Sequence, residues 1–344
     1  MSTQTPVVPE TTDSLPMAPR PRWRFLDTLR GFAIFGILLV NARDITGLGN
    51  DLARPSADPV LDILFLTVQT RFVPIFVLLF GVSMWLVLDG ARARRTTTRI
   101  RPWQAMVLRM VSLTGIGLVL WLAYPGNVLL EYGIFGLLML PIVLLAPRWL
   151  ILATGVAGTI AAYALFGGGL AATPGLILLG AGAAAYGLPR LLETSTRTVL
   201  VVFVAAGVLT VPALMWQLTV PGDPRFSTPG GIAGGIMALL YIAGLALLWR
   251  TPVRRVIDSV FEPLGRMALT NYVTAAVILA LAALLIDFGH MTSVLPSVVL
   301  TVAVIGAQSV FSRLWLGTHA YGPIEWVWRA ATWLRLPAYR LTAR

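Results

Sequence analysis

Long apolar stretches follow one another along most of the chain, and they constrain its fold more than any other feature. A stretch of about 17 to 25 mainly apolar residues is long enough to cross the hydrocarbon core of a membrane as a helix. Such stretches occur at residues 29–47, 72–89, 104–123, 128–146, 149–166, 173–188, 198–218, 230–249, 267–286 and 294–316. We therefore expect an all-α fold, a polytopic integral membrane helical bundle of about ten transmembrane helices.

Composition excludes a soluble domain, because 57% of the residues are hydrophobic and only 12% are charged. The stretches at 149–166 and 173–188 are the least clearly bounded, since they are rich in glycine and alanine. Small residues of this kind favour close packing between transmembrane helices. The chain has no cysteine and two histidines, so we expect no metal site.

The distribution of arginine predicts the topology. All 26 basic residues are arginines, and positively charged residues collect in cytoplasmic loops. With the N-terminus inside, all but four of them fall on the cytoplasmic side; the exceptions are Arg43, Arg54, Arg71 and Arg225. This asymmetry indicates an even number of spans with both termini in the cytoplasm. It also accounts for the net charge of +11 without nucleic acid, and anionic lipid headgroups are the expected partners of that face.

Three regions are expected. Residues 1–24 are rich in proline and threonine and predict a disordered cytoplasmic tail, without the basic start and apolar centre of a signal peptide. Residues 25–316 form the transmembrane helical domain. Residues 317–344 form a cytoplasmic amphipathic tail, which contains Trp326, Trp328 and Trp333. Tryptophans in such a helix are typical anchors in the inner headgroup layer of a membrane.

The first span carries a line of polar residues, Asp27, Arg30 and Asn41. At about 100° per residue, Asp27 and Asn41 lie about 40° apart around the helix, and Arg30 lies about 20° from Asn41. Along the helix axis, Arg30 and Asn41 are separated by about 16 Å. Ionisable side chains are costly in hydrocarbon and commonly mark functional sites. The three residues can therefore line one cavity.

Further polar residues occur at the ends of other spans, and each also has a structural interpretation. The candidates for substrate contact or catalysis are Arg71, Glu131, Arg266, Thr270, Asn271 and Tyr272. Arg71 either extends to the membrane interface or binds a ligand. Glu131 either offsets a helix dipole or needs a partner. Thr270 and Asn271 can bond their own helix or a neighbouring helix as readily as a substrate.

Four segments together resemble a known family. They are Leu26-Asp27-Thr28-Leu29-Arg30-Gly31-Phe32-Ala33 with the following Gly36 to Asn41, then Arg71-Phe72 with Phe76 to Gly81, then Gly265 to Tyr272, and finally Gly322 to Arg329. In this order they resemble the YeiB-like family of bacterial membrane proteins of unknown function. The resemblance spans nearly the whole chain. It implies a protein of the bacterial plasma membrane.

That family is in turn similar to the transmembrane acyltransferase superfamily, whose members move acyl groups from acyl-coenzyme A to sugars or lipid-linked acceptors. The resemblance implies that Asp27 orients Arg30 and that Arg30 holds an anionic group of the donor or acceptor. The superfamily places a histidine base eleven residues after the arginine, where this chain has Asn41. An amide cannot accept that proton, so Asn41 would position an oxygen and Glu131 would have to supply the base. A second departure from the family pattern lies before the fourth span, where this chain has Gly126-Asn127 and the family is expected to have a Gly-Asp pair.

Two functional hypotheses follow. The first is an enzyme-like acyltransferase that binds acyl-coenzyme A in a cavity open to the cytoplasm near Arg30. The second is a transporter or lipid-handling carrier that uses the same polar line for a small solute, with access from both sides of the membrane. A third, a non-catalytic membrane partner of another protein, remains open at this point.

Overall fold

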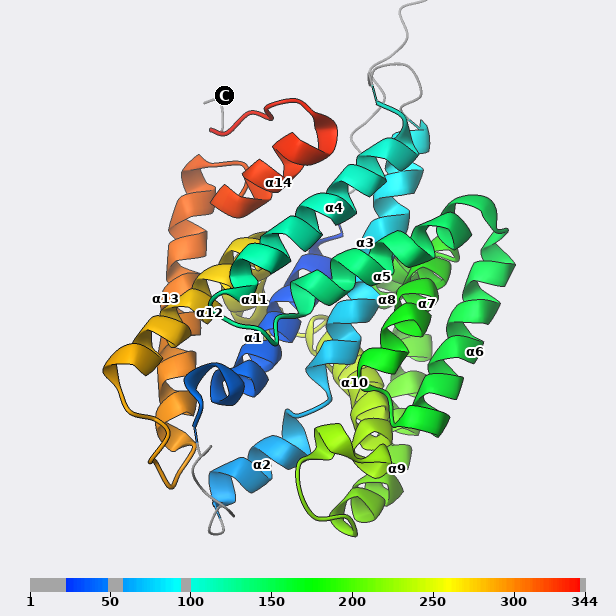
Figure 1. Cartoon of the computed structure of the whole chain (residues 1–344). Helices are drawn as coiled ribbons and strands as arrows, with labels where there is room; N and C mark the ends of the chain where they lie inside the picture. The colour runs from blue at the N-terminus through cyan, green and yellow to red at the C-terminus, as the bar shows by residue number, and fades with distance from the viewer. Residues whose placement is uncertain (1–22, 49–57, 94–99, 341–344) are drawn as a thin grey trace, which may run out of the picture.

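A computed structural model describes residues 23–48, 58–93 and 100–340, and within these ranges the elements are helices (Figure 1). They are α1 (Arg24–Thr46), α2 (Pro59–Thr67), α3 (Phe72–Ala93), α4 (Pro102–Trp121), α5 (Val128–Leu145), α6 (Arg148–Phe166), the 3₁₀ turn η1 (Gly169–Ala172), α7 (Thr173–Ala185), α8 (Leu188–Thr194), α9 (Thr196–Leu218), the 3₁₀ turn η2 (Pro224–Phe226), α10 (Thr228–Leu248), α11 (Arg254–Arg266), α12 (Ala268–Leu285), α13 (Leu295–Thr318) and α14 (Pro323–Trp333). The expected N-terminal tail, 1–24, lies outside the described residues except for its last two positions.

The number of spans agrees with the prediction. Over the described residues, nine segments are long and apolar enough to cross a membrane, and the pair formed by residues 169–185 and α8, bent by 69°, makes up to ten. Helix α7 alone has 13 residues and measures about 20 Å, which is shorter than the hydrocarbon core of about 30 Å. The protein is therefore an all-α polytopic membrane helical bundle, as predicted, in which α7 and α8 form a bent pair.

Helix α1 lies at the centre of the bundle and contacts α3, α11, α12 and α13 (Figure 1). Its closest crossing is with α11, where two glycines let the backbones touch. A Cβ atom on Gly31 would lie 2.0 Å from the carbonyl oxygen of Phe261, and one on Gly265 would lie 1.8 Å from that of Asp27. Because neither position has room for a side chain, this crossing fixes the start of α1 against the end of α11.

A second close crossing joins α3 to α7. A Cβ atom on Gly81 would lie 2.1 Å from the carbonyl oxygen of Ile177, and one on Gly180 would lie 2.1 Å from that of Leu78. Most residues of α7 are buried. The glycine and alanine content of this segment thus serves close helix packing, as the sequence predicted.

Helix α11 was not among the expected elements. It carries Asp258 and Glu262, which receive hydrogen bonds from the start of α1: Thr28 donates to Asp258 over 2.8 Å and Arg24 donates to Glu262 over 2.6 Å. These acids interrupt the apolar pattern, so a search for membrane-length stretches passes over the helix. Its role is to hold α1 in place.

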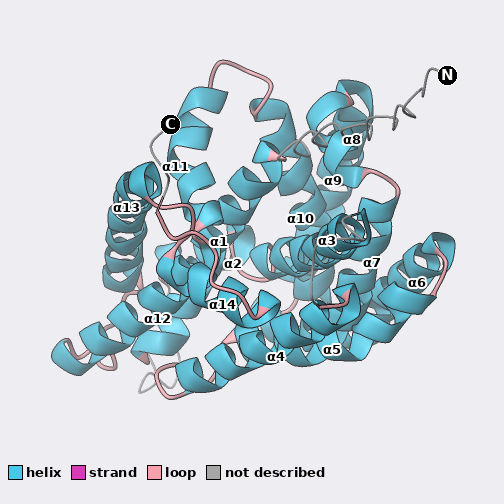
Figure 2. Ribbon diagram, turned by 90° about the horizontal axis from the view of Figure 1, so that it is seen from above, coloured by secondary structure: helices cyan, strands magenta, loops and turns pink. Residues whose placement is uncertain are grey.

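The C-terminal tail packs on the bundle. Figures 1 and 2 both show α14 beside α4, and α14 also contacts α12. Residues 334–338 continue over the same region and, with Trp23, line one cavity. Both described ends of the chain therefore lie at one face of the bundle, which is the arrangement that an even number of spans requires.

Candidate functional site

A cavity of about 1790 Å³ opens between α1, α3, α4, α5, α12 and α14. Helix α3 lines it from Phe76 to Ala91, which corresponds to about 22 Å of helix. The cavity therefore extends from the face where the tail lies deep into the bundle. It is large enough for a ligand with more than one chemical part.

Arginines dominate the charge of this cavity. The charged side chains that line it are Arg30, Arg109, Arg266, Arg329 and Arg335, together with Asp27 and Glu325. The excess of positive charge favours an anionic ligand. No group of three or more His, Asp or Glu residues that could hold a metal ion is found in the described part of the chain.

Asp27 and Arg30 form an ion pair one turn apart on α1. The Nη1 atom of Arg30 donates to Oδ1 of Asp27 over 3.0 Å, and its Nη2 atom donates to the Oγ atom of Ser83 on α3 over 2.9 Å. Asp27 and Ser83 thus hold the guanidinium at the cavity wall. The sequence predicted the pairing of Asp27 with Arg30, but not the contribution of Ser83.

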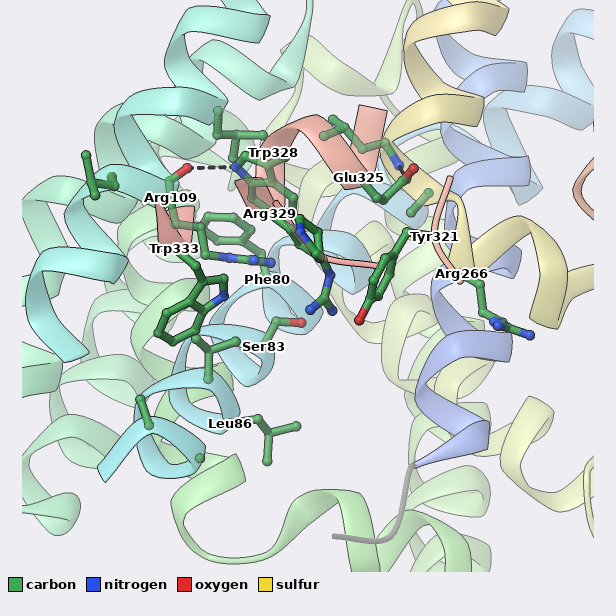
Figure 3. Close-up of a pocket in the computed structure, with 18 of the residues that line it drawn as sticks. Phe80, Ser83, Leu86, Arg109, Arg266, Tyr321, Glu325, Trp328, Arg329 and Trp333 are labelled. Carbon is green, nitrogen blue, oxygen red and sulfur yellow. Dashed lines mark hydrogen bonds between the residues drawn. The ribbon is translucent and has the colours of Figure 1, made fainter. Parts of the chain in front are cut away.

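Arg109 lies within the span formed by α4 and is held by an aromatic ring. Its guanidinium lies 3.6 Å from the ring centroid of Trp328, and the indole N–H of Trp328 donates to the Arg109 carbonyl oxygen over 2.9 Å (Figure 3). Among the described residues no carboxylate bonds this guanidinium. Arg30 and Arg329 line the same cavity as Arg109, so that three like charges face one space.

The tail supplies the wall opposite α4. Arg329 lies with its guanidinium 4.3 Å from the ring centroid of Tyr321, and Figure 3 shows both side chains around the same opening as Arg109, with Arg266 farther away at its edge. Trp328 and Trp333 also line the cavity. These tryptophans, predicted as membrane anchors, contribute to the site.

Glu325 joins the tail to the bundle. Its carboxylate accepts hydrogen bonds from the backbone N–H groups of Leu269 and Thr270, over 2.7 and 3.0 Å, and from the Thr270 hydroxyl over 2.5 Å. It therefore satisfies free donors in the first turn of α12, where a negative charge also suits the helix dipole. Burial raises the pKa of Glu325 from its ordinary value, and the hydrogen bonds from Thr270 oppose this effect.

The deep end of the cavity is aromatic and aliphatic. Tyr132 lies between two phenylalanines of α3, with its ring centroid 5.8 Å from that of Phe76 and 5.7 Å from that of Phe80. Apolar residues complete this end: Leu79, Leu113 and Leu129. Among the described lining residues, the charged side chains come from α1, α4, α11 and the tail, whereas α3 and α5 contribute none. The cavity is therefore charged near the tail and apolar at depth.

Two of the residues predicted for catalysis do not line the cavity. Asn41 is buried and donates to the hydroxyl of Tyr272 over 3.4 Å, so that Tyr272 separates it from the cavity. The same hydroxyl accepts a hydrogen bond from the Val128 N–H over 3.3 Å. Glu131 is half-buried on α5 and lies outside the cavity lining, whereas its neighbour Tyr132 lines it.

Arg71 also lies away from the cavity, where α2 meets α3. Its side chain is fully buried and donates to the Gln217 amide oxygen over 2.6 Å, to the Thr70 hydroxyl over 2.8 Å and to the Gln69 carbonyl oxygen. Its Nε–H group has no hydrogen-bond partner. Arg71 therefore neither snorkels nor lines the cavity, and its contacts join α3 to α9.

Of the predicted group on the ninth span, Arg266 and Tyr272 line the cavity, while Thr270 and Asn271 make structural contacts. Thr270 binds Glu325 as described above. The Asn271 amide donates to the Leu264 carbonyl oxygen over 3.2 Å and to the Ser312 hydroxyl over 3.0 Å. Asn271 thus ties α12 to α11 and α13.

Sequence reasoning missed Arg109 and the tail residues of the site. A signal for Arg109 existed, because an arginine at the sixth residue of the apolar stretch 104–123 is costly unless it faces a polar space. For Tyr132, Tyr321 and Arg329 the sequence offers no comparable signal, since aromatic and basic residues near span ends are typical of interfaces.

Comparisons with known proteins identify the family of the chain. Residues 185–335 match the model of a family described as protein of unknown function (DUF418). This segment includes α12 and α14, and so the tail side of the cavity. The fold and the cavity define a polytopic helical membrane protein with an arginine-lined cavity at the face where its described ends lie.

Relatives extend the match to nearly the whole chain. The "Uncharacterized 39.9 kDa protein in amylase 3'region" of Bacillus acidopullulyticus is 31% identical over 341 residues, which cover 93% of this chain and 96% of that protein. YxaH of Bacillus subtilis (strain 168) is 26% identical over 390 residues, with 90% and 94% covered. YeiB of Escherichia coli (strain K12) is 25% identical over 398 residues, with 93% and 98% covered. The chain belongs to this YeiB-like, DUF418 family, and its resemblance to the YeiB-like family is confirmed.

Proposed function

We propose that this protein binds a phosphate-bearing ligand in the arginine-lined cavity, with acyl-coenzyme A as the first candidate, and that it acts in the plasma membrane of a bacterium. The observation that carries the proposal is Arg109. A guanidinium inside a span is costly, and this one is fixed by Trp328 beside two further cations. A phosphate between Arg30, Arg109 and Arg329 would relieve their repulsion and receive charge-assisted hydrogen bonds.

The acyltransferase relationship is part of this proposal. Asp27 and Ser83 would orient Arg30, and Arg30 would hold an anionic group of the donor. Acyl transfer to a hydroxyl also needs a base for the hydroxyl proton. The described lining residues include no histidine, and both of their carboxylates are engaged, Asp27 by Arg30 and Glu325 by α12. We assign the cavity to donor binding and give Glu131 no role in it.

The cationic lining of the cavity also favours a second candidate function. A cavity with cations and no free base suits a carrier that binds an anionic solute or lipid and moves it without chemistry. A carrier would release its ligand on both sides of vesicles that contain the purified protein, whereas a donor-binding enzyme would not. The arginines of this face are also the proposed contacts for anionic lipid headgroups.

The test is the melting temperature of the detergent-purified protein with and without acetyl-coenzyme A, because a ligand that binds only the folded state raises the apparent stability. At 100 times its dissociation constant the ligand adds about 2.7 kcal/mol. Arg30→Gln should lose most of this shift. Arg148→Gln is the matched control, since Arg148 lies over Tyr186 and outside the cavity, and it should keep the shift. An equal shift in both variants would contradict the proposal.

A further inference from the structure

The apolar deep end of the cavity has no role in binding a phosphate. Below the level where Ser83 receives the Arg30 hydrogen bond, α3 still lines the cavity as far as Phe76. Seven residues of helix correspond to about 10 Å of depth. The side chains at this depth are apolar or aromatic, so water held there would find few polar partners.

Tyr132 at this end has an unusual environment. Its side chain is 1% exposed, and its hydroxyl has no hydrogen-bond partner. The neighbouring cavity tyrosine, Tyr272, bonds both Asn41 and Val128. A buried hydroxyl without a partner is costly, so the ring of Tyr132 is held there by its stacking between Phe76 and Phe80.

From this arrangement we propose that the deep end is a subsite for the apolar chain of the ligand, and that Phe76, Phe80 and Tyr132 set the length of chain that fits. The inference rests on the proposed function for the phosphate end of the ligand. It adds the chemical class of the remaining part of the ligand, which is a linear hydrocarbon or acyl chain attached to a phosphate-bearing head. A phospholipid with one chain has this chemistry, whereas in acyl-coenzyme A the pantetheine arm lies between the phosphates and the acyl chain and would enter the deep end first.

The geometry sets the chain length. An extended chain advances about 1.2 Å per bond, so about 10 Å of depth accommodates about eight bonds. Each methylene transferred from water into the subsite should raise affinity about fourfold, until the chain passes Phe80 and reaches Phe76, the deepest residue of α3 in the lining. Beyond that length, affinity should stop rising or fall, because close-packed walls resist extra volume.

The experiment measures dissociation constants for two series of ligands on the full chain in nanodiscs. One series is acyl-coenzyme A with chains of two to fourteen carbons, and the other is n-alkyl phosphates of the same lengths. In the wild-type protein, the affinity of the alkyl phosphates should rise with chain length and level off near eight carbons, whereas the acyl-coenzyme A series should show no such limit because its pantetheine arm occupies the deep end. Phe76→Ala should move that limit to longer chains, and Phe76→Leu should move it less. A limit near eight carbons in the alkyl phosphate series alone identifies a chain attached directly to the phosphate, whereas a limit in the coenzyme A series alone overturns the inference.

The matched control is Phe203→Ala, since Phe203 is a partly buried ring on α9 that packs near Gly244 and does not line the cavity. It should leave the limit unchanged. Arg30-dependent binding of the alkyl phosphates whose affinity does not vary with chain length, or whose limit is the same in Phe76→Ala, Phe76→Leu and the wild type, overturns the inference and leaves the phosphate site intact. Failure of the wild-type protein to bind either series overturns the proposed function as well.

Discussion

Replacing Glu325 by alanine should detach the C-terminal tail from the bundle. The carboxylate accepts three hydrogen bonds, from two backbone N–H groups and one hydroxyl at the start of α12, and its side chain is 9% exposed. Hydrogen bonds to a charged group contribute about 1.5–3 kcal/mol each, and loss of a helix cap typically costs about 1 kcal/mol. Water can reach some of the freed donors once the tail moves, so the full sum is not lost. We expect the free energy that docks the tail on the bundle to fall by about 3–4 kcal/mol.

Hydrogen exchange followed by mass spectrometry measures this effect locally. In Glu325→Ala, amides of α14 and of the first turn of α12 should exchange faster than in the wild-type protein, while amides of α6 should not change. Glu325→Gln keeps one acceptor oxygen, so its exchange rates should lie between those of the wild type and those of Glu325→Ala.

The control is Asp62→Ala, which removes an exposed carboxylate from the first turn of α2 and should cost less than about 1 kcal/mol. If Glu325→Ala leaves exchange in α14 and α12 unchanged, the carboxylate does not hold the tail, and the reasoning from these three bonds is wrong.

Three further perturbations have defined outcomes. Because the pKa of Glu325 is raised in the folded protein, the folded state binds more protons than the unfolded state between the ordinary value of 4.5 and the raised value. The part of the stability that comes from protonated Glu325 is therefore present below 4.5 and is lost as pH rises through the raised value, while the hydrogen bonds that the carboxylate accepts persist. The difference in unfolding free energy between the wild type and Glu325→Gln, measured by denaturant titration, should fall over that window. Gly265→Ala should destabilise the bundle by at least about 1–3 kcal/mol, because the new Cβ atom would meet the backbone of α1. Gly306→Ala should instead stabilise α13 by up to about 1 kcal/mol, because nothing lies within 4 Å of the new Cβ atom. Thermal unfolding measures both effects. Gln217→Ala should cost about 2–3 kcal/mol by removing an acceptor from buried Arg71, and acetyl-coenzyme A binding in the same samples should be unaffected.

The sequence predicts the spans well because membrane length and hydropathy are properties of the chain alone. It predicts poorly which face of each span points inward. On α5, Glu131 and Tyr132 differ by one step of about 100°, and the packing of α5 against α3 and α4 places the tyrosine on the cavity. Hydropathy contains no information about that rotation.

Distance along α1 explains why Asn41 does not line the cavity although Asp27 and Arg30 do. Asp27, Arg30 and Asn41 do share a face, but about 16 Å separates Arg30 from Asn41. Tyr272 closes the cavity between them by bonding Asn41 from the side of α12. Angular periodicity predicts which residues share a face and leaves open where a neighbouring helix ends the cavity.

The cations of the cavity are arranged for a ligand more than for stability. Arg109 would cost less as an apolar residue, since apolar side chains of similar volume usually stabilise a buried position at least as well as an ion does. Instead it is fixed by the ring of Trp328, while Arg30 is fixed by Asp27 and Ser83 and Arg329 lies over Tyr321. Each guanidinium is held in place by groups that leave part of its hydrogen-bonding fork free. Like charges that are rigidly held near one another store repulsion, and an anion between them releases it. The elements that hold the cations come from the first span, from α3 and α4, and from the tail, so the site exists only when the tail is docked on the bundle.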